Sequence, residues 1–253
     1  MQLDQYISIA ASVGAFLSAL ATFLTVWQIS KQRRATYRPK IVIKRSLVVT
    51  RESKDVLHFP SEDPHQDDDD VVKHLLEWRQ SIEEFKASPD RIRHYALPVL
   101  NAGLGAATDI SVYWEFPMVS FVSATHMLAV NRGHPERIDY RNGLLRIERP
   151  SIISAWRNQD QDHIDYILPA AIDKEPVKLQ IPHAYILAVS TRMALFCRDD
   201  GEERDLPTIP ALKVVFSYKD ISDVSHRISY EIEFDWHSAS PNSFEAELIP
   251  KRV

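Results

Sequence analysis

The feature that most constrains this chain is an apolar segment near its N-terminus. Residues 6–29 carry no charged side chain and read YISIAASVGAFLSALATFLTVWQI. A bilayer has a hydrocarbon core of ~30 Å, and a helix needs ~20 apolar residues to cross it. Tyr6 and Trp27 lie near the two ends, where aromatic rings favour the headgroup level. The segment therefore predicts a single transmembrane helix over residues 1–30.

Two other interpretations of this segment compete with a transmembrane helix. A cleaved signal peptide has basic residues before its apolar core and a small-x-small site after it, whereas this chain shows the reverse order. A buried helix of a soluble protein normally carries a polar stripe, and this segment has none. Both alternatives fit the pattern less well than a membrane span.

The flanks of the segment predict its orientation. Basic residues are retained on the cytoplasmic side of a membrane, and here they follow the apolar segment. A basic juxtamembrane linker is thus expected over residues 31–40, where it attracts anionic lipid headgroups. We expect the N-terminus outside and the remaining chain in the cytosol, at the plasma (inner) membrane. The one cysteine, Cys197, agrees, because it forms no internal disulfide. The basic residues of the linker are Lys31, Arg33, Arg34, Arg38 and Lys40.

One face of the predicted span is built from small residues. Such residues let helices approach closely in lipid, so this face is a candidate surface for assembly into a homo-oligomer. The alternative interpretation is that these residues have no role in assembly, because Ala, Gly and Ser are common in membrane helices. The face consists of Ala11, Gly14, Ser18, Ala21, Thr22 and Thr25.

The rest of the chain is expected to be mainly β with added helices, forming one β-sandwich domain over residues 41–253. Fifteen prolines, six glycines and short apolar alternations suit a sandwich or a barrel. The net charge of -5 argues against a nucleic-acid partner. Predicted antiparallel pairs are 212–219 with 228–235, 93–101 with 107–116, and 137–140 with 144–148 through Asn142-Gly143. Further predicted strands are 40–49, 163–168, 177–181 and 244–249.

Two helices are expected within this β pattern. Val71, Leu75, Trp78, Ile82 and Phe85 recur at helical spacing after an acidic start, which predicts a helix over residues 69–87. The apolar run near 183–198 follows a proline and has helical spacing as well. Its wide apolar coverage leaves a strand as the alternative there.

The turn at 101–110 resembles one found in bacterial immunoglobulin-like β-sandwich modules of the cell-adhesion-related kind. In those modules an apolar strand ends in Asn-x-Gly, as Asn101-Ala-Gly103 does here, and the next strand begins after a small residue. The hairpin around 218–220 is similar to their closing ladder. The resemblance implies a sandwich and no activity. Those modules usually face outward, whereas the basic flank predicts a cytosolic domain.

Motifs for catalysis are few. The run 67–70 with His65 and His74 lacks the spacing of a calcium loop, and we interpret it as a solvated helix start. Cys197 has apolar neighbours, which favours a buried structural thiol. The chain has no Walker loop, no Gly-x-Ser-x-Gly and no His-Glu-x-x-His. We therefore expect no catalysis, no metal and no cofactor.

A second hypothesis is a pocket for a planar anionic ligand. Aromatic rings stack on such ligands, and arginines form bidentate bonds to phosphate. The alternative is that the aromatic residues belong to the core of a sandwich and the arginines lie at its rim, which is the more common arrangement. The pocket would be lined by Trp114, Arg146, Arg149, Trp156 and Arg157.

The leading function predicted from the sequence is a single-pass membrane protein. Its cytosolic domain would mediate interaction with a membrane or cytosolic partner protein, or assembly with itself. The alternative is a ligand-switched membrane effector, for example a nucleotide sensor of the bacterial defence type, that oligomerises through its helix and perturbs the bilayer.

Overall fold

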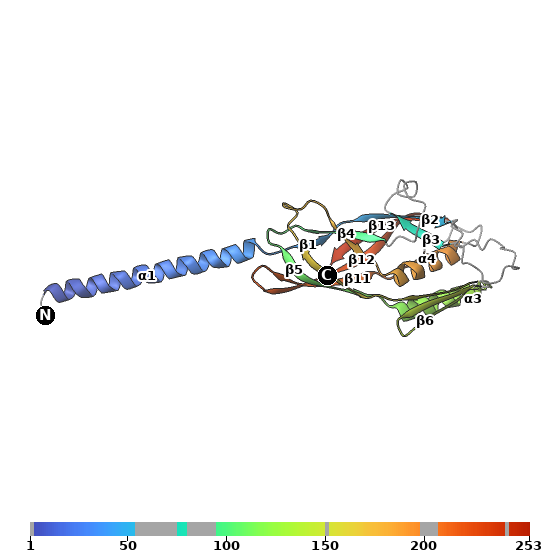
Figure 1. Cartoon of the computed structure of the whole chain (residues 1–253), viewed down its shortest axis with the longest axis horizontal. Coiled ribbons are helices and arrows are strands. Elements are labelled where there is room, and N and C mark those ends of the chain that lie inside the picture. The colour runs from blue at the N-terminus through green and yellow to red at the C-terminus, as the bar shows by residue number, and fades with distance from the viewer. Residues whose placement is uncertain (1–2, 54–74, 80–94, 150–151, 198–206, 241–242) are drawn as a thin grey trace, which may run out of the picture.

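A long helix extends from one end of a β-rich body (Figure 1). The computed structural model describes residues 3–53, 75–79, 95–149, 152–197, 207–240 and 243–253. Helix α1 (Leu3–Thr36) has 34 residues, and every side chain described between residues 11 and 33 is exposed. The stretch Ala11–Arg33 is long and apolar enough to cross a membrane, with a mean hydropathy of 1.5.

The body is organised around a curled, seven-stranded antiparallel sheet that forms a half-barrel. Period-two alternation directs one face of each strand inward, as in β11, where Leu212, Val214 and Phe216 are buried. In sheet order the strands are β3 (Leu75–Arg79), β2 (Ser46–Ser53), β13 (Ser243–Arg252), β12 (Ser225–Ser240), β11 (Leu212–Asp220), β5 (Ala107–Glu115) and β9 (Gln161–Ile167).

Two smaller sheets complete the body. One contains β1 (Ile41–Ile43), β4 (Ala96–Asn101) and β10 (Val177–Gln180), with β4 in the middle. The other contains β6 (Arg137–Arg141), β7 (Leu144–Arg149) and β8 (Ile152–Arg157). The first small sheet carries the chain from α1 into the body, so it lies at the junction between the two.

Two helices pack with the sheets. Helix α4 (His183–Cys197) is buried along most of its length, and Tyr185 contacts Phe116 edge to face with 4.6 Å between ring centroids. Helix α3 (Met118–Asn131) lies beside β6 and α4, at the end of the body far from α1 (Figure 1). The hydrophobic core therefore continues from the large sheet through α4 to α3.

Much of the predicted pattern is confirmed. The chain is mainly β, α4 is a helix, and β11 pairs with β12 so that Phe216 faces Ile228. Strands β6 and β7 pair around Asn142 and Gly143, whose φ angles are 52° and 75°. Positive φ at both positions is what a tight hairpin turn requires.

Several predictions need correction. Residues 75–79 form strand β3 beside β2, not a helix, and the rest of the range 69–87 lies outside the described residues. Strands β4 and β5 exist as predicted but belong to different sheets. Helix α3 was not predicted. The range 31–40 is not one linker, because α1 continues to Thr36.

Candidate functional site

The exposed surface of α1 is the first part of the candidate site. Bulky residues such as Phe16 and Phe23 are 67% and 66% exposed, which is costly in water and favourable in lipid. The predicted assembly residues Ala11, Gly14, Ser18, Ala21, Thr22 and Thr25 are exposed too. The hydroxyls of Thr22 and Thr25 donate to the carbonyls of Ser18 and Ala21 at 2.9 and 2.8 Å. These hydroxyl donors are thus satisfied within the helix, and Gly14 has open space around it.

The predicted basic segment lies where α1 meets the body. Lys31 and Arg33 are exposed in the last turns of α1, and the Lys31 ammonium lies 5.5 Å from the centre of the Trp27 ring. Arg38 and Lys40 follow the helix and are exposed as well. The side chain of Arg34 lies outside the described residues.

The side chain of Asn101, at the end of β4, holds this junction together. It is fully buried. Its Oδ1 accepts hydrogen bonds from the backbone N–H of Lys40 at 2.9 Å and of Gly103 at 3.0 Å. Its Nδ2 donates to the carbonyls of Gly105 at 2.7 Å and Ile167 at 3.2 Å. The side-chain amide of Asn101 therefore joins Lys40, in the segment that follows α1, to the loop 102–106 and to β9.

The two glycines of that loop allow a close approach of backbones. A Cβ on Gly105 would lie 1.8 Å from the carbonyl oxygen of Tyr37. A Cβ on Gly103 would lie 2.3 Å from the carbonyl oxygen of Arg38 and 2.7 Å from the nitrogen of Lys40. A larger residue does not fit at either position unless backbone moves, so the sequence Gly-Leu-Gly is required by packing against residues 37–40.

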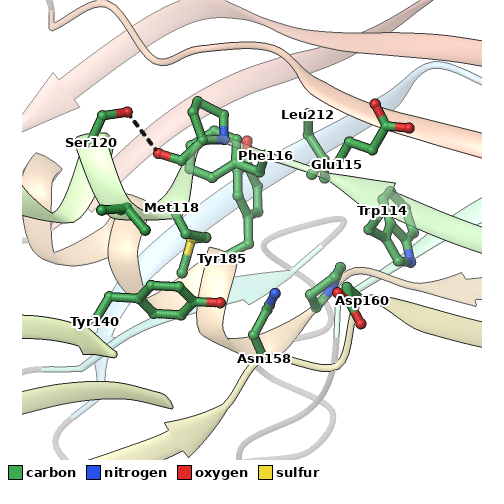
Figure 2. Close-up of a pocket in the computed structure, with 13 residues that line it drawn as sticks. Trp114, Glu115, Phe116, Met118, Ser120, Tyr140, Asn158, Asp160, Tyr185 and Leu212 are labelled. Carbon is green, nitrogen blue, oxygen red and sulfur yellow. Dashed lines mark hydrogen bonds between the residues drawn. The ribbon is translucent and has the colours of Figure 1, made fainter. Parts of the chain in front are cut away.

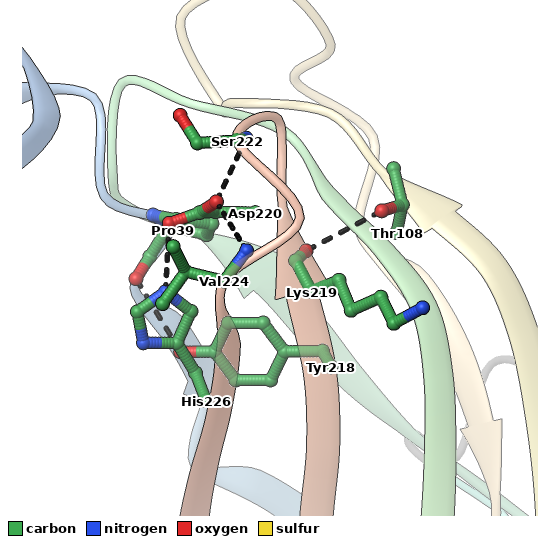
Figure 3. A network of polar contacts seen from close by, with 8 residues as sticks. All are labelled: Pro39, Thr108, Tyr218, Lys219, Asp220, Ser222, Val224 and His226. Atoms are coloured by element: carbon green, nitrogen blue, oxygen red, sulfur yellow. Dashed lines mark hydrogen bonds and ion pairs between the residues drawn. The ribbon is translucent and has the colours of Figure 1, made fainter.

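The turn between β11 and β12 lies at the same junction (Figure 3). The Asp220 carboxylate accepts hydrogen bonds from the backbone N–H of Ser222 and Val224 at 2.8 and 3.1 Å. It also lies 2.9 Å from Nε2 of His226, and the ring of His226 packs on that of Tyr218. The Tyr218 hydroxyl donates to the carbonyl of Pro39 at 3.4 Å, which links the turn to the chain leaving α1.

These contacts shift the pKa of Asp220 below its ordinary value. Burial is the largest influence and raises the pKa, but the hydrogen bonds from His226 and from the two backbone N–H groups together outweigh it. Ionised Asp220 therefore stabilises the folded turn, and this contribution is fully present at pH values above the ordinary pKa of an aspartate. This contribution is lost as pH falls through the lowered pKa.

A cavity of about 580 Å³ lies in the body between β5, α3, the β6–β7–β8 sheet and α4 (Figure 2). Its lining is mainly apolar, and among the residues that line it the charged ones are Glu115 and Asp160. Glu115 is paired with Lys213 at 2.7 Å. Burial raises the pKa of the Tyr185 phenol, which keeps it neutral. The lining includes Trp114, Phe116, Met118, Tyr140, Asn158, Tyr185 and Leu212.

The residues of the predicted pocket for an anionic ligand lie in two different sheets, and the pocket stays a prediction. Of its residues, Trp114 lines the cavity. Trp156 pairs with buried Leu145 and packs against the core, whereas Arg146 and Arg157 are exposed. Arg146 is paired with Glu148 at 2.8 Å. The side chain of Arg149 lies outside the described residues. The charged residues at the cavity are two carboxylates, and one of them, Glu115, is paired with Lys213.

The other candidate sites are a metal site and the thiol of Cys197. The described residues contain no group of three His, Cys, Asp or Glu side chains that could hold a metal ion. The acidic run 67–70, with His65 and His74, and the side chain of Cys197 lie outside the described part.

The junction itself was not predicted as a site. Its signal was the Asn101-Ala-Gly-Leu-Gly105 sequence, which resembles a known turn and does not show what it packs against. Comparison of the chain with protein-family models, with curated proteins and with solved structures gave no match.

Proposed function

We propose that this chain is a single-pass membrane protein whose β body mediates interaction with a partner protein or with another copy of itself. The observation that carries the proposal is α1, whose apolar side chains are exposed along Ala11–Arg33. Burial of that surface in lipid removes a large hydrophobic penalty. The basic residues at its C-terminal end favour a cytosolic body and an N-terminus outside, at the plasma (inner) membrane.

The junction supports this role. Residues 37–40 are hydrogen-bonded and packed to the loop 102–106, so displacement of the body is transmitted to the helix. A partner that binds the body can thus reorient α1, and association of α1 helices can bring bodies together.

A topology measurement tests the membrane part of this proposal. With green fluorescent protein fused after Val253, we expect fluorescent cells and a protein that resists extraction by alkaline carbonate. With alkaline phosphatase at the same place, we expect no activity. Leu17→Arg places a charge near the middle of the span at a cost of ~3 kcal/mol and should release the protein from the membrane. Active phosphatase would show that the orientation is reversed.

Crosslinking in membranes tests the assembly part. Gly14→Leu with Ser18→Leu fills the small-residue face and should weaken association by ~1–2 kcal/mol, or roughly five- to thirtyfold. Phe16→Leu is the matched control, because Phe16 is exposed and is not part of that face. Equal yields of crosslinked dimer from wild type and the double variant would remove α1 from the assembly proposal.

The remaining functional predictions stay predictions. The absence of catalysis is one of them, and the immunoglobulin-like sandwich type of the body is another, with the turn at 101–110 as its support. The ligand-switched alternative would use the cavity at Trp114. Because its charged lining residues are Glu115 and Asp160, we do not favour an anionic nucleotide there.

A further inference from the structure

Loops at the α1 end of the body present exposed apolar side chains. Leu104, in the loop between β4 and β5, is 55% exposed. Ile172, in the loop between β9 and β10, is 72% exposed. Ile221 and Val224, in the turn between β11 and β12, are 64% and 46% exposed. Single exposed apolar residues are common, but here three separate loops each carry one or more at the same end.

Contacts place all three loops beside the start of the body. The loop 102–106 packs on residues 37–40. Pro169 pairs with Asn101, and the N–H of Ala170 donates to the carbonyl of Asn101 at 2.8 Å. Asp220 pairs with Ala107 across β11 and β5. Figure 1 shows the ends of these strands next to the C-terminus of α1.

The length of α1 sets the distance between this end and a bilayer. The charge-free apolar segment ends at Ile29 and the helix ends at Thr36, which is about 10 Å further at ~1.5 Å per residue. The headgroup layer on each side of a bilayer is roughly 5–7 Å thick. The body therefore begins at the outer edge of the headgroup layer, where loops beside the end of α1 can reach the membrane surface.

We propose that Leu104, Ile172, Ile221 and Val224 form a membrane-contact face that inserts into the lipid interface around α1. The inference rests on the proposed membrane span and adds a second attachment to it. A second attachment limits the tilt of the body relative to the membrane, together with that of the α1 helix to which the body is joined.

Charges near the turn are paired with groups of the protein. The ammonium of Lys219 lies 3.3 Å from Asp223 and 3.6 Å from Asp109. The Asp220 carboxylate is held by His226 and by backbone N–H groups. These pairings leave Ile221 and Val224 as the exposed apolar surface of the turn.

Site-specific fluorescence on the full-length chain tests the proposal. The one cysteine is first removed as Cys197→Ser, or as Cys197→Ala if the serine variant unfolds. Single cysteines at Leu104, Ile221 and Val130 are labelled with the polarity-sensitive dye NBD in phosphatidylcholine–phosphatidylglycerol vesicles. Val130, in α3, is the matched control, because it is 54% exposed and lies at the far end of the body. A Leu17→Cys label reports on the span.

We expect lipids with a shallow nitroxide to quench the labels at Leu104 and Ile221 at least twofold and to leave the label at Val130 unchanged. A label at Leu17 should be quenched by a deep nitroxide. Quenching at Leu17 with labels at Leu104 and Ile221 that behave like Val130 would overturn the contact face and leave the span intact. No quenching at Leu17 would overturn the proposed span and the contact face together.

Discussion

Replacing Asn101 with alanine should destabilise the folded body by about 3–5 kcal/mol, because the side chain makes four hydrogen bonds in a fully buried position. The N–H groups of Lys40 and Gly103 lose their acceptor, and the carbonyls of Gly105 and Ile167 lose a donor. Denaturant unfolding of the full-length protein in detergent, followed by tryptophan fluorescence, measures the change.

Two variants separate hydrogen bonding from loss of volume. Asn101→Asp keeps the shape and both acceptor contacts, but it turns an oxygen toward the carbonyls of Gly105 and Ile167 and buries a charge. Asn101→Asp should lower the free energy of unfolding by at least as much as Asn101→Ala does. Asn131→Ala, at the exposed end of α3, should change stability by less than ~0.5 kcal/mol. An Asn101→Ala protein as stable as Asn131→Ala would show that Asn101 does not hold the junction.

Local patterns in the sequence predicted the elements that depend on local contacts. The alternation along β11 and β12 predicts both strands and their pairing, although the turn is shorter than expected because β12 begins at Ser225. Asn142-Gly143 predicts the turn of β6 and β7. Helix α3 had a comparable signal. Its buried residues Met118, Phe121, Val122, Thr125 and Ala129 follow a spacing of three and four. The β-branched residues of the same segment concealed that pattern.

Pairings between distant segments could not be predicted in the same way. Leu75 and Trp78 have helical spacing, yet residues 75–79 pair with β2, so tertiary contacts override the local preference. Strands β4 and β5 are neighbours in the sequence and were expected to pair. Loop 102–106 instead connects two sheets, because Asn101 and the two glycines fix it against residues 37–40.

The candidate site shows the same division. The exposed apolar helix and the basic residues near it follow from composition alone. The predicted ligand pocket stays a prediction, and its residues lie on different sheets and on opposite faces. Trp156 faces the core, whereas Arg146 on the neighbouring strand is exposed. The contact between Asn101 and Lys40 spans 61 positions, and nothing in either segment alone indicates it.

The junction also predicts that Gly105→Ala separates the helix from the body. Its new Cβ would lie 1.8 Å from the carbonyl oxygen of Tyr37, which is a backbone atom and cannot turn away as a flexible side chain would. We expect a loss of about 2–4 kcal/mol, with residues 37–40 displaced from loop 102–106. Trypsin reports this displacement, because it cleaves after Lys40 and does not cleave the Arg38–Pro39 bond. A decrease of ~1.4 kcal/mol in the free energy of local opening raises the population of the open form tenfold. Cleavage after Lys40 should therefore accelerate tenfold or more.

Gly14→Ala provides the matched control for this experiment, because nothing lies within 4 Å of the Cβ that it adds. It should leave both the unfolding free energy of the body and the cleavage rate after Lys40 unchanged. If Gly105→Ala destabilises the body without faster cleavage, residues 37–40 stay attached and the strain is absorbed within loop 102–106. A rate and a stability equal to those of Gly14→Ala would contradict the close backbone contact itself. In that case the junction would be loose, and movement of the body would not be transmitted to α1.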